Sequence, residues 1–189
     1  MATYDNDELL ALCHALLPDD RSLSEVVRLA VEQPAVYWAT VQPHQQLQHT
    51  EQDGDPPTDV PWLALLNGLL ERDQLALLDW RARPDEVIEQ MDRLLRDRPP
   101  ETERWSWMDD VEWDQASTEE FLEAIRRQLQ KHHALLVYFP LDSDMYAVAV
   151  IDEDRFPALQ QHAELTGYGS LERDLSGDEE TLPGSEDEL

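Results

Sequence analysis

Three tryptophans stand among carboxylates between residues 104 and 114. The stretch reads Arg-Trp-Ser-Trp-Met-Asp-Asp-Val-Glu-Trp-Asp and has neither a helical nor a strand period, which predicts a long loop. Tryptophan is common at binding hot spots and stacks on guanidinium groups, and carboxylates attract arginine and lysine. The tryptophans could instead fix the loop to a core. The partner-binding surface that this pattern suggests comprises Trp105, Trp107, Asp109, Asp110, Glu112 and Trp113.

Three aspartates form a second candidate site, one that would make the protein an enzyme. Asp79 lies in a predicted strand, on one face with two leucines, where we expect it to be partly buried and paired with Arg81. Asp142 and Asp144 flank Ser143 in a predicted turn, and an Asp-x-Asp pair can bind a hard cation through its oxygens. Tight turns also favour Asp and Ser, so turn formation alone explains this pair. We therefore expect no metal site and no cofactor.

The thiol and the imidazoles are poorly arranged for nucleophilic catalysis or metal binding. Cys13 and His14 are neighbours on one predicted helix, so their side chains point about 100° apart, and Cys13 falls on the apolar face as a core thiol. His132 and His133 lie at the end of another predicted helix, where positive charge complements the helix dipole. Two histidines that bind one metal ion from the same helix would need to be three or four residues apart. His162 has no ligand-spaced partner in the sequence.

The charge of the chain limits its partners. The sequence has 42 acidic and 14 basic residues, a formal net charge of −28. Such a field repels nucleic acid and anionic membranes and attracts a basic protein. Alternatively, an acidic surface can keep a protein soluble, or adapt it to a salty environment, without binding any partner. With a single cysteine, an acidic start and no apolar run long enough to cross a membrane, the sequence predicts a cytoplasmic protein.

The length of 189 residues suits one domain, which we expect to span residues 1–169. Residues 170–189 contain eight carboxylates and one arginine without apolar periodicity, which predicts a disordered acidic tail.

The strongest strand signal is a hairpin between Leu135 and Ile151. Its first strand is apolar on both faces, so helices must cover both sides of the sheet, and a short strand over 75–80 is expected to pair with it. Helical periods or caps predict helices near residues 5–17, 22–33, 61–70, 84–98, 117–131 and 155–167, the second with a capping box from Ser22 to Glu25. Residues 34–48 fit a strand by propensity, although we favour a helix. These elements predict an α+β domain with a small, mostly antiparallel sheet, one strand plus a hairpin, backed by six to seven helices.

Three short motifs carry a family resemblance: Trp62-Leu-Ala-Leu-Leu, Leu78-Asp-Trp-Arg81, and Ser143-Asp-Met-Tyr146 before a valine-rich strand. With them, residues 5–168 resemble the bacterial family catalogued as domain of unknown function 6630. That resemblance implies no reaction and no catalytic residues. Small acidic α+β proteins are also similar to immunity proteins in size, charge and class.

Two functions follow as hypotheses. The first is a non-enzymatic, immunity- or inhibitor-like protein that binds a basic protein partner through its acidic, tryptophan-bearing surface, without nucleic acid or membrane as partner. The alternative is an enzyme with a carboxylate-based or metal-assisted site near Asp79 and Asp142–Asp144. The sequence leaves the oligomeric state open.

Overall fold

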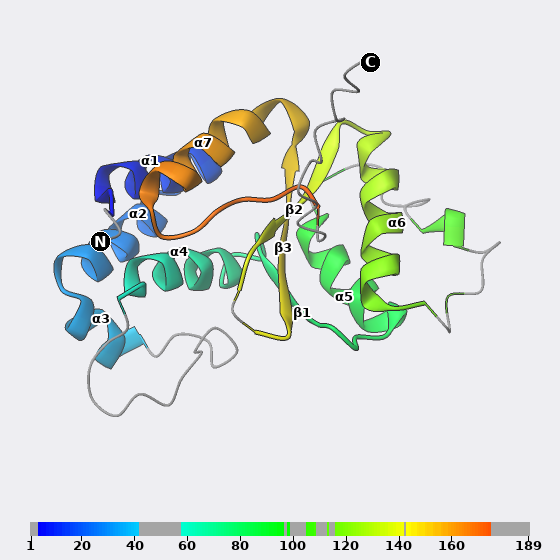
Figure 1. Cartoon of the computed structure of the whole chain (residues 1–189), viewed down its shortest axis with the longest axis horizontal. Coiled ribbons are helices and arrows are strands. Elements are labelled where there is room, and N and C mark those ends of the chain that lie inside the picture. The colour runs from blue at the N-terminus through cyan, green and yellow to red at the C-terminus, as the bar shows by residue number, and fades with distance from the viewer. Residues whose placement is uncertain are drawn as a thin grey trace, which may run out of the picture.

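In the part of the chain that the structure describes, seven α-helices surround a small sheet in an α+β arrangement (Figure 1). The structure is a computed structural model that describes residues 4–41, 58–96, 98, 105–108, 113, 116–141 and 143–174. The helices of this part are α1 (Asn6–Leu16), α2 (Arg21–Glu32), α3 (Pro34–Val41), α4 (Val60–Leu70), α5 (Pro84–Leu94), α6 (Thr118–Gln130) and α7 (Phe156–Thr166). The strands are β1 (Ala76–Asp79), β2 (Ala134–Phe139) and β3 (Met145–Asp152), and two 3-10 turns are η2 (Ser106–Met108) and η3 (Glu153–Arg155).

The sheet has three antiparallel strands in the order β1-β3-β2. β2 and β3 form the predicted hairpin, with Leu136 opposite Val150. β1 pairs with the other edge of β3, with Leu78 opposite Tyr146. The prediction of a hairpin plus one further strand is therefore confirmed.

Helices cover both faces of this sheet, as the apolar pattern of the first hairpin strand predicts. Leu135, Val137 and Phe139 pack into one core cluster with residues of α1, α2, α4 and α7. Leu136 and Tyr138 pack on the opposite face, into a second cluster with α5 and α6. Figure 1 shows the two helical layers on opposite sides of the strands. None of the described helices is long and apolar enough to cross a membrane.

The start of α2 differs from the prediction. The capping box that we expected at Ser22 does not form, because the helix begins one residue earlier, at Arg21, and Asp20 is its N-cap. The Asp20 carboxylate accepts the first-turn backbone N–H groups at 2.9 and 3.3 Å. Its second oxygen pairs with Arg72, a contact from the end of α4 that the local sequence could not indicate.

The segment from Pro34 is a helix, as favoured, through Val41. Residues 42–48 of the predicted helix lie outside the described residues.

The domain extends beyond residue 169, where we predicted its end. Leu171 is only 1% exposed, and Glu172 exchanges two backbone hydrogen bonds with Tyr138 of β2, at 2.8 and 2.9 Å. Asp174 lies 3.5 Å from Arg126 of α6. The prediction of disorder is therefore wrong for residues 170–174, because the outer edge of β2 has backbone groups that this segment pairs with. Residues 175–189 lie outside the described part.

Candidate functional site

Trp80 is the most exposed of the six tryptophans, all of which the structure describes. Its side chain is 46% exposed and follows the last residue of β1. We call the surface around it the Trp80 corner. Its residues come from the end of β1, the start of β3 and the first turn of α6: Asp79, Trp80, Arg81, Glu119, Asp144 and Tyr146.

Backbone contacts from three directions fix the Trp80 corner. The Trp80 N–H donates to the carbonyl oxygen of Asp144 at 3.1 Å, which extends the pairing of β1 with β3 by one residue. The hydroxyl of Thr118 is 2.7 Å from the carbonyl oxygen of Trp80 and 3.0 Å from that of Ala82. Because Thr118 is 2% exposed, this hydrogen bonding holds the chain reversal after β1 against the start of α6.

A cationic side chain already lies on the Trp80 ring. The guanidinium carbon of Arg81 lies 4.1 Å from the ring centroid, which is within the range of a cation–π contact. The side chains of Asp79, Asp144 and Glu119 are all exposed. Partial burial raises the pKa of the neighbouring Tyr146, and the negative charge of Glu119 raises it further. The corner thus combines an exposed aromatic ring with acidic side chains.

Asp79 is not the partly buried carboxylate that we predicted. It is exposed, because β1 is an edge strand that ends at this residue. Its Oδ1 accepts the backbone N–H of Arg81 at 2.7 Å, while the Arg81 guanidinium lies on the Trp80 ring instead. The predicted pairing of the two side chains is therefore wrong. Asp79 acts locally as a turn residue.

The structure brings Asp79 and Asp144 to the same corner, since Asp79 pairs with Met145. Asp144 is exposed, and Ser143 next to it accepts the N–H of Met145 at 3.3 Å, which is turn chemistry. Asp142 lies outside the described residues. Within the part of the chain that the structure describes, no group of three His, Cys, Asp or Glu side chains is placed to hold a metal ion.

The three tryptophans of the predicted loop pack against the core. The ring centroids of Trp107 and Trp113 lie 6.2 and 5.1 Å from that of Phe121 in α6, and 5.4 Å from each other. Trp105 lies 6.4 Å from Trp107 and donates its indole N–H to Asp92 of α5 at 2.9 Å. All three rings are half-buried beside the cluster under α5 and α6. Asp109, Asp110 and Glu112, the carboxylates expected beside them, lie outside the described residues.

Cys13 is a fully buried core residue, as predicted, and burial raises the pKa of its thiol to about 12. His14, on the next position, is exposed. His133 is exposed and lies 3.7 Å from Glu153. His162 does have a partner that the sequence could not show: its Nδ1 is 2.7 Å from a carboxylate oxygen of Glu8, which joins α7 to α1.

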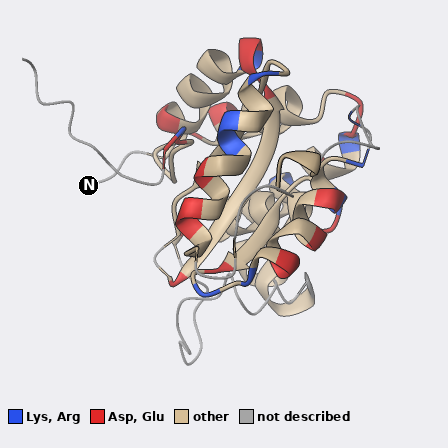
Figure 2. Ribbon diagram, turned by 90° about the vertical axis from the view of Figure 1, so that its right-hand side faces the viewer, with Lys and Arg blue, Asp and Glu red and all other residues tan. Residues whose placement is uncertain are grey.

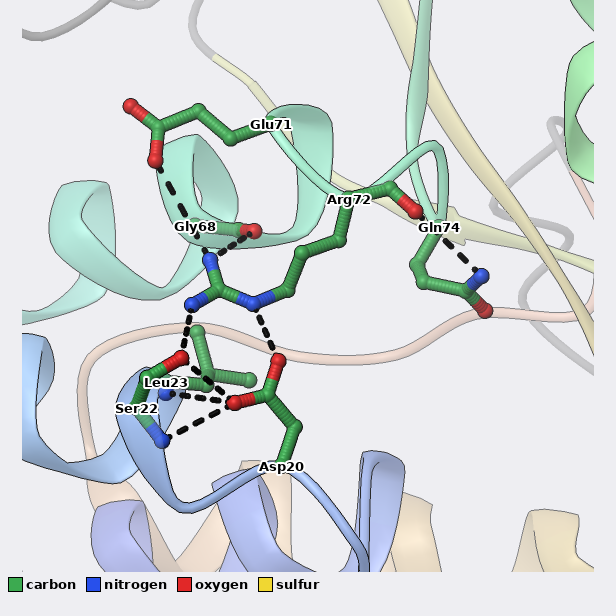
Figure 3. Close-up of polar contacts among 7 residues, drawn as sticks. All are labelled: Asp20, Ser22, Leu23, Gly68, Glu71, Arg72 and Gln74. Carbon is green, nitrogen blue, oxygen red and sulfur yellow. Dashed lines mark hydrogen bonds and ion pairs between the residues drawn. The ribbon is translucent and has the colours of Figure 1, made fainter.

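A cluster of polar side chains forms a clasp between α2 and the end of α4 (Figure 3). The Arg72 guanidinium donates to Asp20 at 2.5 Å, to the Ser22 hydroxyl at 2.6 Å and to the carbonyl oxygen of Gly68 at 2.7 Å. The hydrogen bond from Ser22 and the pair with Arg72 hold the pKa of Asp20 well below its usual range. Every member of the clasp is engaged within it, so its role is to fix α2 on α4.

Hydrogen bonds shift the pKa of several other described carboxylates. They lower the pKa of Asp85 through Arg83, that of Glu120 through the backbone N–H of Ser117, and that of Glu123 through Arg126. Figure 2 shows Asp and Glu on several helices of one side of the molecule, with Lys and Arg among them.

A sequence model of one family, described as a domain of unknown function (DUF6630), matches residues 8–173. The chain belongs to the DUF6630 family. No curated protein and no solved structure matches it. The matched range takes in the Trp80 corner, the tryptophan cluster and the segment through Arg173 that pairs with β2.

Sequence reasoning treated Trp80 only as the end of a strand. The Trp80-Arg81 dipeptide suggests a cation–π pair, since an adjacent arginine is a common partner of a tryptophan ring. The exposure of the ring had no signal in the sequence, because the predicted strand included Trp80, whereas β1 ends at Asp79.

Proposed function

We propose that this protein is a non-enzymatic binding protein of the immunity or inhibitor kind, which binds a basic protein partner at the Trp80 corner. The observation that carries the proposal is the exposed Trp80 ring on a segment whose backbone neighbours include exposed carboxylates. Asp79 precedes Trp80, the carbonyl oxygen of Asp144 accepts its backbone N–H, and Glu119 follows Thr118, whose hydroxyl donates to the Trp80 carbonyl oxygen. An exposed tryptophan with exposed charged residues nearby in the fold has the composition of a binding hot spot.

The chemistry of the corner favours an arginine-bearing partner. The Arg81 guanidinium on the Trp80 ring demonstrates that the ring accepts this group. A partner arginine can stack on the same ring and pair with a neighbouring carboxylate, a combination that lysine makes less well. The net charge of −28 supports the choice of a basic partner, because it accelerates the encounter with positive charge.

The tryptophan cluster is less suited to be the contact surface. Its rings are half-buried against Phe121, and Trp105 uses its indole N–H on Asp92. We therefore place the centre of binding at Trp80 and assign the cluster to holding its loop on α5 and α6.

The cellular setting that we propose is the cytoplasm of a bacterium. One buried cysteine, whose thiol has a pKa of about 12, fits a reducing compartment and makes a poor nucleophile. The same thiol pKa favours a binding protein over a thiol enzyme.

The test begins with affinity capture on the full-length protein from native cytoplasm, at low and at high salt. The retained basic protein is then titrated against the wild type and against Trp80→Ala. We expect Trp80→Ala to weaken binding by about 2 kcal/mol, roughly 30-fold in Kd, with an unchanged unfolding curve.

Two variants serve as matched controls. Tyr4→Ala removes another exposed aromatic, 42% exposed, from the N-terminal side of α1, and Glu164→Gln neutralises an exposed carboxylate on α7. Neither is expected to change Kd, whereas Asp144→Asn should slow association and reduce its salt dependence. An equal loss of affinity in Trp80→Ala and Tyr4→Ala would exclude the Trp80 corner as the contact surface.

A further inference from the structure

A groove between α1 and α2 gathers basic side chains on an otherwise acidic protein. Its volume is about 350 Å³, and it is lined by Leu10 and His14 of α1 and by Arg21, Ser24, Glu25 and Arg28 of α2. Residues spaced by three, four and seven share one face of a helix, so these side chains converge on a common space. The two helices that line the groove, α1 and α2, lie on the opposite side of the sheet from α5 and α6 (Figure 1).

Arg21 and Arg28 differ from the other arginines that the structure describes. Each of the others contacts a carboxylate, a backbone carbonyl or an aromatic ring: Arg72, Arg81, Arg83, Arg93, Arg96, Arg98, Arg126, Arg127, Arg155 and Arg173. Arg21 and Arg28 have no such partner among the described residues, although the chain has three acidic residues for every basic one. Two unpaired guanidinium groups in one groove point to an anionic ligand.

The acidic residues nearest in sequence leave both arginines available. Asp20 precedes Arg21 but is already paired with Arg72 in the clasp, which keeps its charge away from the groove. Glu25 stands one turn from each arginine, a spacing that permits an ion pair, yet it pairs with neither. Glu25 therefore remains an acceptor for hydroxyl or amine groups of a ligand.

We propose that this groove binds a small organic phosphate of nucleotide size. Arg21 and Arg28 bind the phosphate oxygens, since a guanidinium group donates two parallel hydrogen bonds to such an anion. The His14 ring and the Ser24 hydroxyl can add hydrogen bonds, and Glu25 accepts from sugar hydroxyl groups. The half-buried Leu10 side chain supplies an apolar contact, and the volume falls at the lower end of the range for small-molecule sites.

Isothermal titration of the full-length protein with ADP tests this proposal, at about 0.15 M salt and without divalent metal. At that ionic strength charges more than about 8 Å apart are largely screened, so remote carboxylates do not mask a local site. We expect saturable 1:1 binding of ADP and of ribose 5-phosphate, and none of adenosine, which lacks the phosphate.

Variants assign the binding to the groove. Arg21→Gln and Arg28→Gln, both on exposed positions, are each expected to weaken ADP at least ~10-fold, because each removes charge-assisted hydrogen bonds. Arg127→Gln removes the same charge from an exposed position on α6 and should leave the affinity unchanged. Glu25→Gln should weaken ADP more than inorganic phosphate, because only ADP has sugar hydroxyl groups.

Three results would overturn the proposal. If ADP shows no saturable binding, the proposed site does not exist. Adenosine or inorganic phosphate binding as tightly as ADP contradicts the combination of phosphate and hydroxyl recognition. An equal loss in Arg127→Gln and the groove variants shows that only net charge matters.

Discussion

Leu171 anchors the segment that follows α7, and its removal offers a quantitative test of the fold. The side chain is 1% exposed and belongs to the core cluster of α1, α2, α4 and α7. A buried Leu→Ala change in a core costs about 2–5 kcal/mol of unfolding free energy. In a domain of this size each kcal/mol lowers the midpoint by roughly 2–4 °C, so Leu171→Ala should lower Tm by roughly 4–20 °C.

The assay is thermal unfolding followed by circular dichroism, with Leu165→Ala as the matched control. Leu165 is 50% exposed on α7, so the same truncation there should cost less than about 1 kcal/mol. A third protein, lacking residues 175–189, should unfold at the wild-type midpoint, because that stretch of the sequence is acidic and has no apolar periodicity to bury. Equal midpoints for Leu171→Ala and Leu165→Ala would refute the docking of the segment on the domain.

Three further substitutions test single contacts. Gly169→Ala should destabilise the domain by about 1–3 kcal/mol in thermal unfolding, because its Cβ would lie 2.5 Å from the rigid, buried ring of Trp62. Trp105→Phe should cost about 1 kcal/mol by loss of the hydrogen bond to Asp92 of α5. Trp113→Phe should cost less, because its buried indole N–H has no hydrogen-bond partner among the described residues. Burial raises the pKa of Tyr37 to about 12, so the fold disfavours its ionised form. Its stabilising effect is complete below pH ~10 and is lost as the pH rises towards 12, and Tyr37→Phe should reduce this alkaline loss in unfolding measured between these pH values.

Each of these predictions has a contradicting result. A Gly169→Ala protein as stable as the wild type would mean that the Trp62 ring can move away. A larger loss in Trp113→Phe than in Trp105→Phe would indicate a partner for the Trp113 indole. A Tyr37→Phe protein with the alkaline stability profile of the wild type would show that this phenol does not titrate with unfolding.

The sheet could be predicted because its signal is local. Leu135, Leu136 and Val137 are all apolar, and successive residues of a strand point to opposite faces. Both faces of this strand must therefore be covered, wherever it lies in the fold. The apolar stripes of α1, α5 and α6 are local signals of the same kind. Their burial follows the prediction, with Leu9, Val87 and Phe121 in the core.

Contacts between distant parts of the chain explain what the sequence could not indicate. Leu171 stands among charged residues without any period, and its burial depends on the free edge of β2. Asp20 rather than Ser22 caps α2, and its other carboxylate oxygen pairs with Arg72, 52 residues later. The exposure of Trp80 depends on where β1 ends, and the pairing of β1 with β3 sets that point. For the candidate site, the sequence indicated which kinds of residue could bind a partner, but it did not indicate which of them are exposed.

The strand order β1-β3-β2 also determines when the domain can close during synthesis. β1 finds its partner only after β3 has been made, and α1 packs against α7, which follows still later. The edge of β2 receives its cover last, from Glu172. Until that residue leaves the ribosome, an apolar strand edge remains open to other chains, and such edges promote aggregation. A nascent chain that stops before Glu172 should therefore depend on chaperones more than the full chain does.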